Sequence, residues 1–186
     1  MLPELFRDDV FRLETRRLWL RWPRLADAAA LSAFSGKGDA SRPAAFLPHA
    51  ANVQEAEAFV RACCEGNASG EHLRLALTLK TGPRELIGMI GVEPRGETLG
   101  FSYWLGKGYC GQGYVGEAAA AAIDAFFRFS RAEEIDALAS EGNAKSQAML
   151  ASVGFRAVGK REAAGLPGGD PALLFALSRR DWQTAA

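Results

Sequence analysis

The sequence lacks the usual features of a membrane or secreted protein. No stretch approaches the roughly 20 apolar residues that a transmembrane helix needs. The first residues, Met1 to Asp9, have no basic start followed by an apolar run, so no signal peptide is evident. We therefore expect a cytoplasmic protein with no membrane partner.

Cysteine and histidine are also scarce. The three cysteines are Cys63, Cys64 and Cys110, and the two that adjoin are poorly placed to bridge each other. The two histidines, His49 and His72, are far apart, and no C-x-x-C pair occurs. We therefore expect reduced cysteines and no metal site.

An excess of charge of one sign is absent as well. Lysine and arginine total 22, and so do aspartate and glutamate. Because proteins that bind nucleic-acid phosphates usually carry a basic excess, we expect no nucleic-acid partner. The composition is that of a globular protein, since 48% of the 186 residues are hydrophobic and 24% are charged. No break in composition divides the chain, which predicts a single domain over 1–186.

Hydrophobic periodicity in the first part of the chain predicts a strand, two helices and a meander. Alternation over 18–22 indicates a half-buried strand, and the alanine-rich stretch 25–34 favours a helix. Glycine and proline in 36–48 predict a loop. Three further segments are joined by short turns and predict an antiparallel meander. They are Leu73–Leu79, Leu86–Val92 and Leu99–Leu105.

A capping signal marks the start of the second helix. Asn52 stands where an N-cap is expected, and Glu55 follows at the third helical position. Apolar residues then repeat at helical spacing until Gly66 and Asn67, which predict the end of the helix.

The second half of the chain alternates between helix and strand. Helical periodicity extends over Val115–Phe129 and Asn143–Val153, and Gly154 follows the second of these as a helix stop. Short apolar segments at Ile135–Leu138 and Leu173–Leu177 predict strands. A meander followed by this alternation predicts an α/β (α+β) fold, in which helices flank a mixed sheet.

A glycine-rich loop carries the strongest functional signal. Glycine stands at positions 106, 108, 111, 113 and 116, between a predicted strand and a strongly periodic helix. Glycine lets backbone N–H groups point into a common concavity. The helix that follows adds unpaired N–H groups and the positive end of its dipole. The segment therefore predicts a site for an anion of the pyrophosphate type.

Two familiar phosphate-binding motifs fit this loop poorly. A P-loop ends in Gly-Lys-Ser/Thr, and that tripeptide is absent. The stretch Gly111–Gly116 does spell the dinucleotide-binding pattern G-x-G-x-x-G. However, it follows a meander instead of opening a parallel βαβ series, and the next strand ends without an acidic residue. The context argues against a nicotinamide-dependent oxidoreductase, which we keep as a third hypothesis.

Several motifs together resemble the GNAT superfamily, in its ribosomal-protein N-acetyltransferase (RimJ/RimL-type) branch. They occur in order along nearly the whole chain. They are Leu13-Glu14-Thr15-Arg16-Arg17-Leu18, Tyr103-Trp104-Leu105-Gly106, Gly111-Gln112-Gly113-Tyr114-Val115-Gly116-Glu117-Ala118, Asn143-Ala144-Lys145-Ser146, Val153-Gly154-Phe155 and Leu177-Ser178-Arg179-Arg180-Asp181-Trp182.

The resemblance implies a fold and a co-substrate. The fold would be a mostly antiparallel sheet of about six to seven strands, splayed between the fourth and fifth strands. Acetyl-CoA would lie in that opening, with its pyrophosphate on the amides of 112–116. Cys110 and Val115 depart from the Arg/Gln and the small residue usual in the superfamily's loop. The cofactor-binding residues would be Tyr103, Trp104, Leu105, Cys110, Gly111, Gln112, Gly113, Tyr114, Val115, Gly116, Asn143 and Ser146.

The resemblance also implies direct attack of an amine on the thioester, without an acyl-enzyme. Ser146 is the candidate for protonating the leaving thiolate, although Asn143 and Ser146 also fit an ordinary N-cap and N3 pair. Glu93 and Glu97 are candidate bases, although each fits a solvated turn carboxylate as well. Cys110 has no histidine nearby in sequence and is read as a loop residue.

The acceptor is left open by these residues. At pH 7 the neutral form of an amine with pKa 10.4 is disfavoured by about 4.6 kcal/mol, whereas an α-amine near pKa 8 costs only about 1.4 kcal/mol. A protein N-terminal α-amine therefore suits a site without a conspicuous base, and a small-molecule amine is the other candidate. The alternative to an enzyme is a catalytically silent acetyl-CoA-binding sensor or partner module. A homodimer is compatible with the sequence.

Overall fold

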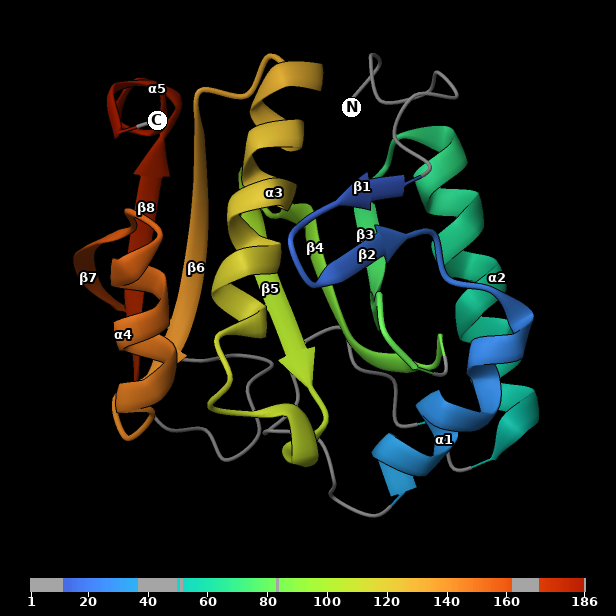
Figure 1. Cartoon of the computed structure of the whole chain (residues 1–186). Coiled ribbons are helices and arrows are strands. Elements are labelled where there is room, and N and C mark those ends of the chain that lie inside the picture. Colours follow the sequence, from blue (N-terminus) through green and yellow to red (C-terminus); the bar gives the residue numbers. More distant parts are fainter. Residues whose placement is uncertain (1–11, 37–49, 51, 83, 162–170, 186) are drawn as a thin grey trace.

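A single sheet organises the chain. The computed structural model describes residues 12–36, 50, 52–82, 84–161 and 171–185. Within these residues, eight strands are ordered β1-β2-β3-β4-β5-β6-β8-β7 (Figure 1). The strands are β1 (Arg12–Glu14), β2 (Leu18–Arg21), β3 (Leu73–Leu79), β4 (Leu86–Arg95), β5 (Thr98–Leu105), β6 (Glu134–Ser140), β7 (Arg156–Arg161) and β8 (Ala172–Ser178).

Helices cover both faces of this sheet. Residues of α3 and α4 pack on one face, and residues of α1 and α2 pack on the other (Figure 1). The described helices are α1 (Ala28–Gly36), α2 (Val53–Ser69), α3 (Tyr114–Phe129), α4 (Ala144–Ser152) and α5 (Arg179–Ala185), with 3-10 turns η2 (Leu25–Asp27) and η3 (Lys107–Tyr109).

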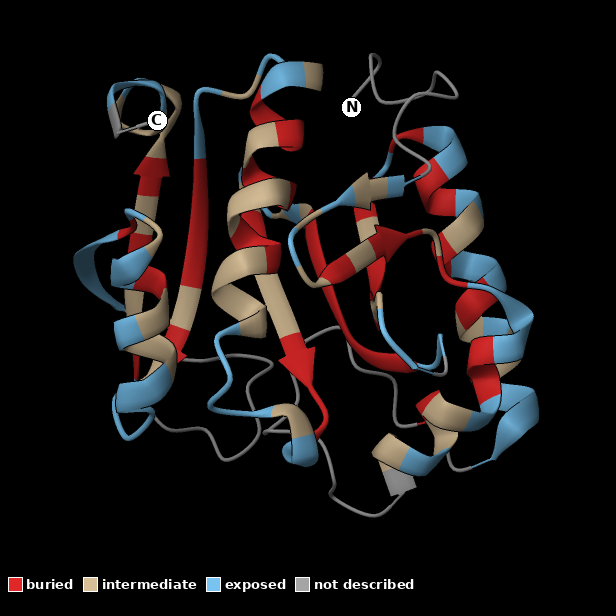
Figure 2. Cartoon of the chain, in the orientation of Figure 1, coloured by how far each residue is buried: buried red, intermediate tan, exposed pale blue. Residues whose placement is uncertain are grey.

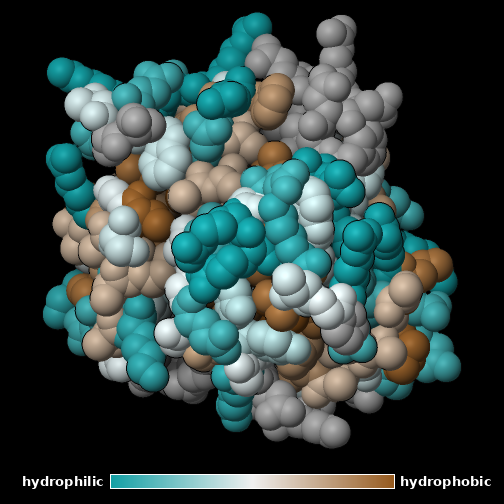
Figure 3. Space-filling view, in the orientation of Figure 1, coloured by the Kyte–Doolittle hydropathy of each residue, from teal (hydrophilic) through white to brown (hydrophobic). Residues whose placement is uncertain are grey.

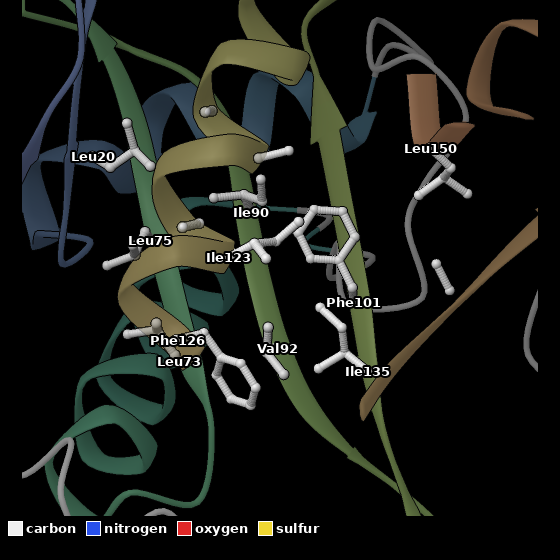
Figure 4. Close-up of a cluster of buried hydrophobic side chains, with 14 of the residues drawn as sticks. Leu20, Leu73, Leu75, Ile90, Val92, Phe101, Ile123, Phe126, Ile135 and Leu150 are labelled. Atoms are coloured by element: carbon white, nitrogen blue, oxygen red, sulfur yellow. The ribbon is translucent and has the colours of Figure 1, made fainter. Parts of the chain in front are cut away.

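Strand alternation divides the buried side chains into two cores. Leu75 pairs with Ile90 and points towards α3, whereas the next pair, Ala76 and Met89, points towards α1 and α2. The larger core lies beneath α3, where Ile123 packs on the sheet (Figure 4). Successive strand residues thus serve opposite cores, as the two-residue period requires.

The predicted fold class is confirmed, with more strands than expected. All but one of the neighbouring strand pairs are antiparallel, the exception being β5 with β6. The two additional strands are β1, which has only three residues, and β7, which is exposed along its whole length (Figure 2). Neither offers the alternating apolar pattern by which a strand is found in a sequence.

The predicted end of α2 at Gly66 and Asn67 is wrong. The helix continues to Ser69 and ends at Gly70, whose φ of 67° is left-handed. Gly66 therefore lies inside the helix. Its glycine is explained by the His72 ring, which occupies the space that a side chain at position 66 would need. Asn67 is buried, and its side chain bonds the backbone N–H and C=O of Arg74 in β3. Both residues serve contacts with the following strand.

The sheet opens between β5 and β6, as the resemblance implies. The parallel ladder between them contains two residue pairs, Gly100–Asp136 and Phe101–Ala137, although both strands continue beyond it. The strands therefore diverge after Phe101. Figure 1 shows the N-terminal ends of α3 and α4 at the end of the molecule towards which β5 and β6 diverge.

The predicted loop lies outside the described residues from the residue after Gly36 up to residue 48. The described part of the surface in Figure 3 is mostly hydrophilic on this face, with apolar residues in small separate groups. None of the described helices combines the length and apolarity needed to span a bilayer.

Candidate functional site

The glycine-rich loop folds into a turn that delivers the chain to the start of α3. Gly111 and Gly113 have φ values of 78° and 77°, in the left-handed region that glycine adopts without strain. Gly113 is the N-cap of α3, and it makes no side-chain capping bond. The other long helix, α2, is capped by Asn52, which accepts from the N–H of Glu55. The N-terminus of α3 is thus the one with unfilled donors.

The donors of this turn are accessible. The first helical bond of α3 is donated by the N–H of Glu117 to Gly113, which leaves the preceding N–H groups of the first turn without an intrahelical acceptor. An added Cβ at Gly108, Gly111 or Gly116 would meet no atom within 4 Å. Backbone N–H groups, the positive end of the helix dipole and a bare surface together suit an anion with several oxygens.

The predicted loop residues surround this turn. Gln112 is exposed, and its side chain donates to the carbonyl of Gly108 at 3.2 Å. Tyr114 and Val115 are half-buried and contact the large core. Cys110 is exposed, and its thiol lies 3.5 Å from the Gly106 carbonyl. These positions agree with a site built from backbone groups, in which the side chains serve the shape of the turn.

A hydroxyl pair bridges β5 and α4 beyond the point where the strands diverge. The Tyr103 hydroxyl lies 2.8 Å from Ser146 Oγ, and either atom can be the donor. Asn143 is the N-cap of α4 and accepts from the N–H of Ser146 at 3.1 Å. Asn143 thus fills the capping role that the sequence allowed, while the Ser146 hydroxyl is turned to Tyr103. Burial raises the pKa of Tyr103 although the hydrogen bond to Ser146 lowers it, so the phenol keeps its proton at neutral pH.

Trp104 and Leu105 lie in the cores. The Trp104 side chain is fully buried on the α1 and α2 face, with its ring centroid 5.4 Å from that of Phe34. Leu105 is buried in the large core on the other face. Tyr103 and Trp104 therefore point to opposite sides of the sheet, and only Tyr103 of this pair faces Ser146. Alternation along a strand predicts that the two side chains point to opposite faces. The sequence motif does not indicate which of these faces meets Ser146.

The two candidate bases have different surroundings. Glu97 is exposed in the turn between β4 and β5, as expected for a solvated turn carboxylate. The same interpretation of Glu93 is wrong, because Glu93 lies within β4 and forms a partly buried ion pair with Arg74. The side chain of Glu93 is 16% exposed, and that of Arg74 is 19% exposed. Arg74 also lies over the Phe59 ring, which places the pair on the α2 side of the sheet.

Arg17 is a residue of this region that the sequence did not single out. Its guanidinium donates from Nη1 to the Gln112 carbonyl at 2.8 Å and from Nε to Glu117 at 2.7 Å. It also lies over the Tyr114 ring, 4.4 Å from the centroid. The available signal was Glu117 itself, because a carboxylate in the first turn of a helix predicted to bind an anion would repel that anion unless a cation lay beside the carboxylate.

A second ion pair lies where β5 and β6 are still paired. Asp136 of β6 is 5% exposed and accepts from Arg95 of β4 at 2.5 Å and from the Thr98 hydroxyl. The Arg95 guanidinium passes over Gly100, where an added Cβ would collide with it. The contact therefore connects β4 to β6 across β5.

The described parts of the chain contain no group of three or more His, Cys, Asp or Glu side chains that could hold a metal ion. A shallow hollow lies between β7, β8 and α5 and contains none of the predicted site residues; it is lined by Arg156, Ser178, Arg180, Asp181 and Thr184.

Comparison with known proteins gives a family and a fold. Residues 17–156 match the family model described as "Acetyltransferase (GNAT) domain". No curated protein matches the sequence. The matched range includes the glycine-rich loop, Tyr103 and Ser146.

Solved structures share the fold over almost the whole chain. Mycobacterium smegmatis RimJ in complex with CoA-disulfide has a TM-score of 0.75 at 22% identity, with 91% of this chain and 87% of that chain covered. A ribosomal-protein-S5-alanine acetyltransferase from Vibrio fischeri has a TM-score of 0.76 at 20% identity, with 92% and 98% covered. The microcin C7 self-immunity acetyltransferase MccE, in complex with acetyl-CoA and AMP, has a TM-score of 0.72 at 19% identity, with 91% and 99% covered.

Proposed function

Because the chain belongs to the GNAT acetyltransferase family and is thus an acetyl-CoA-dependent acetyltransferase, we propose that it acetylates a primary amine. The acceptor is a protein N-terminal α-amine or the amine of a small molecule. The amine attacks the thioester directly within a ternary complex. In support, no histidine or carboxylate bonds the thiol of a described cysteine, as the general base of an acyl-enzyme route would. Cys110 bonds a backbone carbonyl, and His72 contacts the backbone of Cys63.

The turn before α3 is proposed to hold the diphosphate of acetyl-CoA. The amides of 112–116 supply the donors, and the N-terminus of α3 supplies the positive dipole. Tyr103 and Asn143 flank the route from this turn towards the point where β5 and β6 diverge, and the pantetheine chain is proposed to follow β5 there. The short β5–β6 ladder supports this placement, because it leaves the strands apart beyond Phe101.

The observation that carries the mechanism is the contact between Tyr103 and Ser146. We propose that the Ser146 hydroxyl donates a hydrogen bond to the sulfur that leaves when the amine attacks. Tyr103 donates in turn to Ser146 Oγ, 2.8 Å away, and so fixes its orientation. The raised pKa of Tyr103 keeps the phenol in the donating form. The resemblance of the Asn143–Ser146 motif supports the same role.

The removal of a proton from the acceptor is proposed to need little help. Glu93 is engaged by Arg74 and Glu97 is exposed, so neither has the isolated, apolar surroundings of a strong general base. An α-amine loses only about 1.4 kcal/mol by deprotonation at pH 7. We therefore propose a water-mediated transfer, with Glu93 and Glu97 as the side chains to test.

Acetyltransferases of similar fold carry names that point to different targets. The Vibrio fischeri enzyme is named as a ribosomal-protein-S5-alanine acetyltransferase, and MccE is named for self-immunity to microcin C7. A likeness near 20% identity gives the fold and leaves the acceptor to experiment. The single sheet supports one domain over the chain, and the three free cysteines support the cytoplasm as its location. The homodimer stays a prediction, which sedimentation of the purified protein would test.

The proposed function is tested with a panel of acceptors. The purified chain is incubated with acetyl-CoA and with peptides and small amines, and mass spectrometry reports which nitrogen gains an acetyl group. We expect acetylation of at least one primary amine, together with release of free thiol above background. Tight binding of acetyl-CoA without acetylation of any member would favour the silent binding module instead.

A further inference from the structure

We propose that Arg17 is a positioning residue, which holds the turn before α3 in the shape that binds a diphosphate by fixing Glu117 and the Gln112 carbonyl. The inference rests on the proposed function, in which that turn holds acetyl-CoA. Arg17 lies in the turn between β1 and β2, directly before β2, and is 100 residues away from Glu117 in sequence. It acts through its neighbours, and its own guanidinium is already engaged by them.

Glu117 creates the need for this residue. Its carboxylate lies in the first turn of α3, close to the amides proposed to hold a diphosphate. A free negative charge there would repel the ligand. The carboxylate instead accepts from the Thr15 hydroxyl at 2.6 Å, from the Arg17 N–H at 2.7 Å and from Arg17 Nε at 2.7 Å. The whole negative charge thus faces the β1–β2 turn.

The same bonds keep Glu117 in one protonation state. Burial by itself raises the pKa of its carboxyl, but the hydrogen bonds from Thr15 and Arg17, together with the charge of Arg17, lower it below the usual value. Glu117 is therefore a carboxylate across the neutral range. The negative charge that Arg17 meets is therefore constant in this range, which suits a structural brace.

The second contact of Arg17 sets the direction of a peptide group. The Gln112 carbonyl accepts from Arg17 Nη1 at 2.8 Å, so this oxygen faces the guanidinium. Gly113 follows with left-handed φ, and the next N–H groups belong to the first turn of α3. If the carbonyl turned into the concavity instead, it would place a negative oxygen among the donors. Arg17 prevents that rotation.

Arg17 is itself held by the sheet. Its carbonyl accepts from the N–H of Lys80 at 2.9 Å, and its guanidinium lies over the Tyr114 ring. Nε and Nη1 are both used within the protein. The turn before α3 is therefore fixed to the β1–β2 turn by a planar fork that a lysine cannot reproduce.

The test separates the diphosphate from the thioester. Arg17→Met and Glu117→Gln are compared with Arg61→Met and Glu57→Gln, which remove a similar pair from the exposed surface of α2. Calorimetry gives the Kd for CoA. Kinetics are measured with acetyl-CoA and with S-acetylpantetheine, which has the thioester but no diphosphate. Circular dichroism melting confirms that each variant is folded, and Arg17→Lys serves as a second variant with the charge retained.

We expect Arg17→Met to raise the Kd for CoA by about 10- to 100-fold, with kcat for saturating acetyl-CoA within about threefold of wild type. Turnover of S-acetylpantetheine stays within about twofold. Glu117→Gln also weakens CoA, by about tenfold, because it releases Arg17 from the turn. The Kd for CoA of Arg17→Lys lies between the values for wild type and Arg17→Met. The Arg61 and Glu57 variants match wild type in every measurement.

Two results would overturn the proposal. If Glu117→Gln tightened the binding of CoA while Arg17→Met weakened it, Arg17 would be a cation that contacts the ligand directly. If Arg17→Met reduced turnover of S-acetylpantetheine as strongly as that of acetyl-CoA, its role would be general stability. Failure of the wild-type chain to bind CoA would instead overturn the proposed function itself, so the two failures are distinguishable.

Discussion

The two ends of the seam between β5 and β6 are built in opposite ways. At the paired end, Gly100 and Phe101 form a ladder with β6, and Asp136 is bonded by Arg95 and Thr98. At the diverging end, the pair Tyr103–Ser146 joins β5 to α4 at 2.8 Å. One end satisfies its polar groups within the protein. The other end brings the Tyr103 and Ser146 hydroxyls together at the end of the molecule where α3 and α4 begin.

The difference indicates that the paired end contributes to the stability of the fold and that the diverging end carries the proposed chemistry. A buried carboxylate whose two oxygens both accept from protein donors contributes to the fold and presents little surface to a ligand. Backbone donors without a cap are costly unless water or a ligand meets them. We infer that the paired end fixes the angle between the strands, and that the diverging end uses the opening that results.

The largest expected effect is at the paired end. Asp136→Ala leaves the partly buried Arg95 without its partner and should lower the free energy of unfolding by about 3 kcal/mol. Urea denaturation measures this loss. Asp124→Ala is the matched control, because it removes an exposed i,i+4 pair with Arg128 and should cost less than about 0.5 kcal/mol. Equal losses in the two variants would contradict the importance of the buried pair.

The diverging end should show the reverse behaviour. Ser146→Ala should lower kcat by about 100-fold, the range of a lost proton donor, and Tyr103→Phe by about tenfold, since it removes one orienting hydrogen bond. Both variants should unfold within about 1 kcal/mol of wild type. Steady-state kinetics and urea denaturation are measured on the same samples. A loss of stability that accounted for the loss of rate would remove the catalytic interpretation.

Two glycines sharpen the comparison further. Gly100→Ala places a methyl group against the Arg95 guanidinium and should destabilise the protein by about 2 kcal/mol. Gly116→Ala has no neighbour within 4 Å and lies in a helix, so it should stabilise the protein by about 0.5 kcal/mol. The added methyl enters the proposed diphosphate site and should weaken CoA. Thermal melts with and without CoA measure both effects, and unchanged CoA affinity would contradict the placement of the ligand.

The smallest effect concerns pH. The pKa of Glu117 is lowered in the folded protein, so its stabilising bonds are complete above the ordinary glutamate pKa of about 4.3 and are lost as pH falls through the lower folded value. The difference in unfolding free energy between wild type and Glu117→Gln should be about 1 kcal/mol at pH 6 and shrink towards zero on acidification. A difference that grew on acidification would have the wrong sign.

Features fixed by local chemistry were predictable from the sequence. The glycine spacing before α3 predicted the turn that leads into this helix, because glycine and a helix start act within a few residues. The capping role of Asn52 was confirmed, since its bond to Glu55 spans three residues. The apolar periodicity of α3 likewise marked the helix that covers the large core.

Features fixed by distant contacts were not predictable. Gly66 marked a false helix end, because its purpose is to admit the His72 ring. The Arg95–Asp136 pair joins residues 41 apart in sequence, and the Arg17–Glu117 pair joins residues 100 apart. A single sequence gives no indication of which arginine meets which carboxylate.

Hydrogen exchange tests the central claim, that backbone donors from Gln112 to Gly116 hold the diphosphate of acetyl-CoA. Amide exchange is followed by mass spectrometry with saturating CoA and, separately, with pantetheine, which lacks the diphosphate. We predict that CoA slows exchange within residues 111–117, whereas pantetheine leaves this segment unchanged. Protection by CoA elsewhere on the chain, with residues 111–117 exchanging as in the free protein, would contradict the account.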